Sequence, residues 1–180
     1  MSVIAFEPNP RTADVLERSV AHNGYEDRIQ VVRTAVADEE GELDFAIDTA
    51  NSGRCRIANE SSRGARTVRV PVVTLDAWLD RHPLTKRVSI VKIDVEGCEV
   101  RALRGMRRFL AEHRPALVVE AYDDTLRSYG SSLPELHGLV DELGYREVRP
   151  ADGNMYLEPT AKVGMILSAG RQPSRSGGAT

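Results

Sequence analysis

The most constraining feature of this sequence is an apolar run that ends in acidic residues and continues into a helix. Residues Val88–Ile93 are mostly apolar, and Asp94, Glu96 and Glu99 follow at once. Such a run is typical of a parallel strand that is covered on both faces. Acidic residues at its carboxyl end would face the crevice in which open α/β sheets bind ligands. The segment therefore predicts an α/β sheet that handles a small molecule.

Length and charge exclude several classes of protein. The 180 residues, 41% of them apolar, suffice for one domain with its own core. A formal charge of −3 without a basic block argues against a nucleic-acid partner. No apolar stretch approaches the roughly 20 residues that span a bilayer, and no signal-peptide pattern is present. We therefore expect a cytoplasmic protein with a small-molecule partner and no nucleic-acid or membrane partner.

Strands and helices alternate along the sequence. Strands are predicted over residues 3–6, 29–36, 43–47, 68–72, 88–93, 116–119, 145–148 and 154–157. Helices are predicted over residues 10–22, 75–79, 100–113 and 133–143, with Asn9 as an N-cap and Ser132 opening a capping box. This alternation predicts a doubly wound, Rossmann-like α/β sheet.

One α/β domain over residues 1–168 is expected, followed by a tail at residues 169–180 whose Gly, Ser, Arg and Pro content predicts disorder. Residues 49–66 are rich in Ser, Asn, Gly and Arg without periodicity, which indicates a surface loop. A substrate lid and plain disorder both fit this loop. Cys55 and Cys98 lie far apart and are expected to be reduced thiols.

Glu7 ends the strand predicted at residues 3–6. In Rossmann-like sheets an acidic residue that ends the second strand hydrogen-bonds the ribose hydroxyls of a bound nucleotide. A solvated strand end without a ligand is the alternative, and the pattern alone does not decide between them.

Five segments occur in a recognisable order: Val3–Pro10, Ala35–Gly41, Val70–Asp76, Val91–Glu99 and Arg114–Glu120. Together they resemble the FkbM family of S-adenosylmethionine-dependent methyltransferases, over about residues 3–122. The resemblance implies the Rossmann-like class I methyltransferase fold and S-adenosylmethionine as the cofactor. It implies O-methylation of a hydroxyl on a sugar, polyketide or similar metabolite. It also implies that Glu7 binds the cofactor's ribose, that Asp38 lies near the adenine, and that Cys98 is a small space-filling residue.

The sequence departs from the family at its beginning. A glycine-rich cofactor loop belongs roughly 20 residues before the position of Glu7, and only six residues precede Glu7 here. We therefore expect an N-terminally truncated fold without its first strand and helix, and with a hairpin and loop insertion at about residues 42–73. An upstream start, a decayed gene, or a strand donated by a partner or by a second copy would account for the departure. Direct pairing of the strands at residues 3–6 and 88–93 would close the gap.

Methyl transfer to a hydroxyl needs in-line alignment and a base. Asp94 is the first candidate because it ends the strand beside the expected cofactor position, and Glu96 lies on the same side of an extended backbone. Glu120 ends the next strand and is the second candidate. The same three carboxylates could hold Mg²⁺, which prefers oxygen ligands. Glu99 is interpreted as a residue that the dipole at the helix N-terminus favours.

Two other functions remain open from the sequence. The first is a non-catalytic subunit or an inactive remnant, which would need no residues beyond these 180. A nicotinamide dehydrogenase would share the acidic strand end, but the sequence contains no G-x-G-x-x-G fingerprint.

Overall fold

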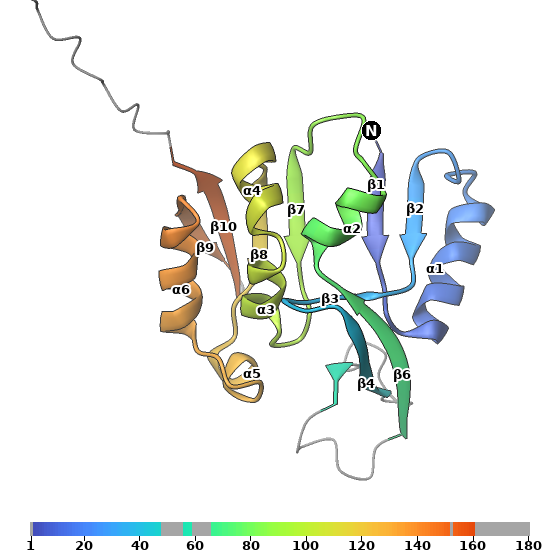
Figure 1. Cartoon of the computed structure of the whole chain (residues 1–180), viewed down its shortest axis with the longest axis horizontal. Coiled ribbons are helices and arrows are strands. Elements are labelled where there is room, and N and C mark those ends of the chain that lie inside the picture. The colour runs from blue at the N-terminus through green and yellow to red at the C-terminus, as the bar shows by residue number, and fades with distance from the viewer. Residues whose placement is uncertain (1, 48–55, 59–65, 152, 161–180) are drawn as a thin grey trace, which may run out of the picture.

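The computed structural model describes residues 2–47, 56–58, 66–151 and 153–160, whose strands form three separate sheets (Figure 1). The α/β class agrees with the sequence, and among these residues the strands do not join into one sheet. The predicted tail at residues 169–180, Cys55 and most of the predicted loop at residues 49–66 lie outside them. None of the described helices is long and apolar enough to cross a membrane.

The first sheet is a parallel pair joined by a helix. Strands β1 (Val3–Phe6) and β2 (Ile29–Val32) flank α1 (Pro10–His22) in sequence. The Asn9 side chain accepts the Arg11 amide at 3.1 Å, which confirms the predicted N-cap. This unit places Glu7 at the carboxyl end of β1.

The second sheet carries the main core, and its strand order is β7 (Ile90–Ile93), β8 (Ala116–Glu120), β10 (Asn154–Pro159) and β9 (Tyr145–Ala151). Strands β7 and β8 run parallel, and β10 is antiparallel to both of its neighbours. The chain also forms α5 (Asp123–Arg127), which the sequence did not predict, and α6 (Leu133–Glu142). The Ser132 hydroxyl accepts the Glu135 amide at 3.3 Å, so Ser132 caps α6 as predicted.

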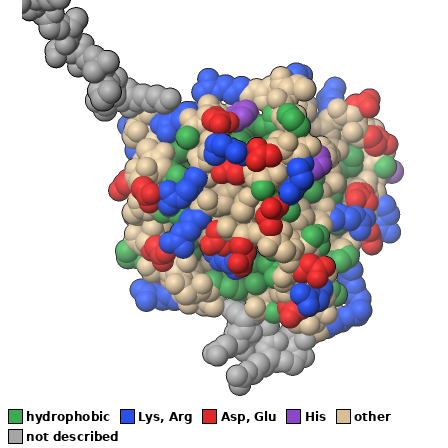
Figure 2. All heavy atoms as spheres, viewed as in Figure 1, with side chains coloured by type: hydrophobic (Ala, Val, Ile, Leu, Met, Phe, Trp, Pro, Cys, Tyr) green, Lys and Arg blue, Asp and Glu red, His purple; other side chains and the backbone are tan. Residues whose placement is uncertain are grey.

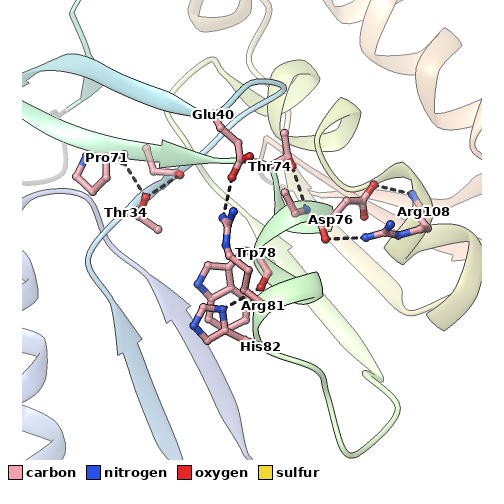
Figure 3. A network of polar contacts seen from close by, with 11 residues as sticks. Thr34, Glu40, Pro71, Thr74, Asp76, Trp78, Arg81, His82 and Arg108 are labelled. Atoms are coloured by element: carbon pink, nitrogen blue, oxygen red, sulfur yellow. Dashed lines mark hydrogen bonds and ion pairs between the residues drawn. The ribbon is translucent and has the colours of Figure 1, made fainter.

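The predicted helix at residues 100–113 is divided into α3 (Glu99–Arg104) and α4 (Arg107–His113). At the break, a Cβ on Gly105 would lie 1.8 Å from the Ala37 carbonyl oxygen, so the backbones touch there. Asp76, in α2 (Leu75–Arg81), caps α4, because its carboxylate accepts the amides of Arg108 and Phe109, each at 2.9 Å. Figure 3 shows the contact between Asp76 and Arg108. Tertiary contacts therefore override a pattern that reads as one helix.

The third sheet has the strand order β3 (Ala35–Val36), β6 (Arg66–Val73), β4 (Gly41–Ile47) and β5 (Arg56–Ile57). The strand predicted at residues 29–36 is thus split between two sheets. Thr34, at the split, donates from its hydroxyl to the Pro71 carbonyl at 2.8 Å, which turns the chain toward β6 (Figure 3). Figure 1 shows this sheet beyond the carboxyl ends of β1 and β7.

Strands β1 and β7 do not pair, so direct closure of the gap between them is not observed among the described residues. Val3 and Ile90, one on each strand, are 42% and 54% exposed. Strand β7 is therefore not covered on both faces, which corrects the sequence prediction. The connection across the gap is made by α2, whose Trp78 lies edge to face against Phe6 with ring centroids 5.1 Å apart.

Charged side chains of both signs are interspersed over the face shown in Figure 2. Four arginines of α3 and α4 form ion pairs with neighbouring elements: Arg101 with Asp38, Arg104 with Glu135, Arg107 with Glu142, and Arg108 with Asp80. Pairs this exposed contribute about 0–1 kcal/mol each, so apolar burial carries most of the stability. The inward positions predicted for Val100, Leu103, Met106 and Leu110 are all buried, as expected.

Candidate active site

Three acidic side chains meet at the carboxyl ends of β7 and β8. Carboxylate oxygens of Asp94, Glu96 and Glu120 all lie within 4.8 Å of one another. The parallel register explains this, because Ile93 lies opposite Val119 and each strand places an acidic residue at the next position. The three predicted catalytic residues are thus brought together.

Glu96 reaches this cluster by a different route from the one predicted. An extended backbone would place residues 94 and 96 on one side, but Glu96 has the left-handed φ of 54° and lies in a turn. Gly97 follows with φ 100°, and a Cβ there would lie 2.5 Å from the Thr125 carbonyl oxygen. A tight bend against α5, rather than strand alternation, therefore directs Glu96 toward Glu120.

Lys92 is a member of the site that the sequence interpretation missed. Its Nζ donates to Asp94 Oδ2 at 2.7 Å, and this hydrogen bond raises the pKa of the lysine. Residues 92 and 94 share one side of a strand, so the alternation of side chains could have identified the pair. The ammonium group offsets part of the negative charge of the cluster.

Glu120 has the most perturbed carboxyl group of the cluster. Burial raises its pKa to about 7, and the negative charges of Asp94, Glu96 and Glu99 act in the same direction. Lys92 opposes the shift without cancelling it. A carboxyl group of this kind exchanges protons near neutral pH.

Glu99 is buried, with 1% of its surface exposed. Its Oε1 accepts the amides of Val95 and Gly97, each at 3.1 Å. Burial raises the pKa of this carboxyl, and these hydrogen bonds counteract the rise. The predicted role, a favourable charge at a helix N-terminus, accounts for neither the burial nor the two hydrogen bonds.

The two predicted cofactor residues lie outside the carboxylate cluster. Glu7 is half-buried and accepts the Asn9 amide at 2.7 Å, and burial raises its pKa. Asp38 accepts a 2.7 Å hydrogen bond from Arg101 Nε, which ties the turn after β3 to α3. The carboxylate of Asp38 therefore already has a structural partner.

Cys98 has the space-filling role expected of it. It is 1% exposed, and burial raises the pKa of its thiol to about 12. Because the thiolate is the reactive form, this cysteine is inert near neutral pH.

Two hollows on the surface lie away from these residues. One, of about 320 Å³, is lined by α2 and α4 and includes Asp76, Arg108 and His113. The other, of about 440 Å³, includes Val3, Trp78 and His82. Neither contains any of the five predicted site residues, so the carboxylate cluster remains the candidate site.

Comparison with known proteins identifies the family of the chain. The sequence pattern of the methyltransferase FkbM domain matches residues 2–147. A crystal structure of methyltransferase FkbM from Methylobacillus flagellatus KT is similar with a TM-score of 0.55 and 20% identity. The match covers 87% of this chain and 36% of that one, and at this identity it shows the fold alone. No match is found among curated proteins. With four-fifths of its length matched by the domain pattern, the chain belongs to the FkbM methyltransferase family.

Proposed function

We propose that this chain is an S-adenosylmethionine-dependent O-methyltransferase domain that acts on a hydroxyl of a sugar, polyketide or similar metabolite. The observation that carries the proposal is the meeting of three carboxylates, Asp94, Glu96 and Glu120, within 4.8 Å of one another. Burial raises the pKa of Glu120 to about 7 in this cluster. Such a group suits the removal of a hydroxyl proton in a family of methyltransferases.

In this proposal Glu120 is the general base. A base whose pKa lies near the operating pH combines a useful ionised fraction with enough driving force for proton transfer. Asp94 is the second candidate, since its carboxylate already accepts a 2.7 Å hydrogen bond from Lys92. Asp94 and Glu96 would then orient the acceptor through hydrogen bonds from its hydroxyl groups.

S-adenosylmethionine would supply the electrophilic methyl group. Glu7 fits the ribose, because a half-buried carboxylate at the carboxyl end of β1 can accept hydrogen bonds from ribose hydroxyls. The Asn9 amide orients it by bonding to one of its oxygens. Asp38 would mark the neighbourhood of the adenine without binding it directly, since Arg101 occupies its carboxylate.

We also propose that a further parallel strand fits between β1 and β7 and carries the glycine-rich loop for the amino-acid end of the cofactor. Two observations support this: among the described residues, β1 and β7 each have one edge that pairs with no other strand, and Val3 and Ile90 are exposed. A longer form of the chain, a partner or a second copy could supply the strand. Strands β4, β5 and β6 would then form the insertion expected at about residues 42–73.

A non-catalytic subunit is the second candidate function. The separation of the β1–β2 pair from the β7 sheet favours it, because among the described residues no strand joins the two sheets there. In that case the carboxylates would serve only the fold.

Titration of the folded ¹⁵N-labelled chain with S-adenosylhomocysteine, followed by NMR, separates the two functions. We expect weak binding with shifts around Glu7, lost in Glu7→Ala and kept in Glu17→Ala, an exposed carboxylate on α1. Complete absence of binding would favour the subunit. Micromolar affinity would contradict the need for a further strand.

Turnover measurements test two points: Glu120 as the general base, and Mg²⁺ as a cation bound by the three carboxylates. Methyl transfer to a panel of sugar and polyketide alcohols should fall strongly in Glu120→Gln. Turnover that survives a chelator would exclude Mg²⁺ as an occupant of the three carboxylates.

A further inference from the structure

Glu99 packs against the loop of residues 94–98, which carries two of the three clustered carboxylates, Asp94 and Glu96. It begins α3, and its side chain turns back to residues 95–97 instead of pointing to solvent. A single oxygen, Oε1, accepts two amides of that loop, at 3.1 Å each. Burying a carboxylate is costly unless hydrogen bonds compensate, so this contact constrains the loop strongly.

The loop needs such a constraint for two reasons. Glu96 has a left-handed φ of 54°, which a residue with a side chain adopts at some energetic cost. The bend also brings the Asp94 and Glu96 carboxylates within 4.8 Å of Glu120, where like charges repel. Both effects favour a relaxed loop that would separate the carboxylates.

The opposite side of the loop is closed by α5 and the residues after it. A Cβ on Gly97 would lie 2.5 Å from the Thr125 carbonyl oxygen and 2.6 Å from the Tyr129 ring. The bend is therefore held on one side by the Glu99 carboxylate and on the other by packing against Thr125 and Tyr129.

We propose that Glu99 is a positioning residue, which holds residues 94–98 in the bend that presents Asp94 and Glu96 to Glu120. Its effect on turnover rests on the proposed function, whereas its effect on the loop does not. Glu99 does not belong to the group of three carboxylates and acts through the backbone.

Two substitutions of Glu99 test the role of its Oε1 as a hydrogen-bond acceptor. Glu99→Met keeps an unbranched, buried side chain but removes both hydrogen bonds. Glu99→Gln keeps a carbonyl oxygen in the place of Oε1. Asp76→Leu is the matched control, because Asp76 likewise accepts two backbone amides, at the start of α4 and away from the loop.

Amide hydrogen exchange, measured by NMR, tests the loop. We expect exchange at Val95 and Gly97 to become about 10-fold faster in Glu99→Met and to stay near the wild-type rate in Glu99→Gln. Asp76→Leu should lower the melting temperature without this local change. Unchanged exchange at both amides in Glu99→Met would overturn the proposal, whether or not the chain is an enzyme.

Kinetics test the positioning role. We expect kcat in Glu99→Met to fall about 10- to 100-fold while KM for the methyl donor stays nearly constant, with recovery in Glu99→Gln. If amide exchange in the loop becomes faster but kcat does not change, Glu99 does not position the carboxylates for catalysis. That result would leave the proposed function intact. Absence of turnover in a form that also contains the further strand would refute the proposed function and, with it, a catalytic consequence of Glu99. Amide exchange would still decide whether Glu99 holds the loop.

Discussion

The hydroxyl of Tyr129 donates a 2.5 Å hydrogen bond to the carbonyl of Ile57, 72 positions earlier in the chain. The ring of Tyr129 also lies against Gly97, which follows Glu96 in the bend. One side chain thus connects β5 of the third sheet to the candidate active site. The described part of the predicted loop at residues 49–66 is anchored at this point.

Removal of this anchor should affect both stability and acceptor binding. We expect Tyr129→Phe to lower the free energy of unfolding by about 0.5–1.5 kcal/mol, the net value of one hydrogen bond. KM for the acceptor should rise as β5 is released, with donor affinity unchanged. Urea denaturation and kinetics measure the two effects. Tyr25→Phe, at a ring that is 45% exposed, is the control, and an equal loss in both variants would argue against the anchor.

Glu120 should make stability depend on pH. Its pKa rises from 4.5 to about 7 on folding, so the folded chain binds more protons between these values. Its stabilising contribution is complete below about pH 4.5 and is lost as the pH rises through about 7. We expect Glu120→Gln to lose less stability than the wild type between about pH 5 and pH 8, as measured by urea denaturation. Parallel pH profiles would show that Glu120 has an ordinary pKa.

The contact between Gly105 and Ala37 should tolerate no side chain. A methyl group would lie 1.8 Å from the Ala37 carbonyl oxygen, so we expect Gly105→Ala to destabilise the chain by about 1–3 kcal/mol or more. Gly138, in α6, has open space within 4 Å of the position that a methyl group would take, and Gly138→Ala should stabilise by about 0.4–1 kcal/mol. Thermal unfolding compares the two variants. A melting temperature unchanged by Gly105→Ala would mean that the two backbones separate easily.

The roles of Glu7 and Asp94 should be separable. We expect Glu7→Ala mainly to weaken binding of S-adenosylhomocysteine, because its carboxylate would bind ribose. Asp94→Asn should lower turnover and leave that binding largely intact, because Asp94 belongs to the carboxylate cluster that would orient the acceptor. Calorimetry and initial rates distinguish these outcomes. Equal loss of binding in both variants would contradict the division of roles.

Much of this arrangement could be predicted from local sequence. The N-caps at Asn9 and Ser132 and the acidic ends of β7 and β8 all follow from short-range rules, and the structure confirms them. Adjacent parallel strands end at the same edge of a sheet, so the meeting of Asp94 and Glu120 was predictable as well.

The features that could not be predicted depend on contacts between distant residues. The helix break at Gly105 needs the Ala37 carbonyl, and the split of the strand at Thr34 needs Pro71. The bend at Glu96 needs the buried Glu99 on one side and Thr125 on the other. Periodicity reports which face of an element is apolar, and it contains no information about such partners.

The separation of the β1–β2 pair from the β7 sheet shapes how the chain can fold. The strands within residues 3–32 pair with one another, and so do the strands within residues 90–159, so each half can form its sheet from one contiguous stretch of chain. The two halves are then joined by the sheet of β3 and β6 and by the packing of Trp78 on Phe6. We therefore expect folding to proceed by docking of two units that form early, with Trp78 at the junction between them.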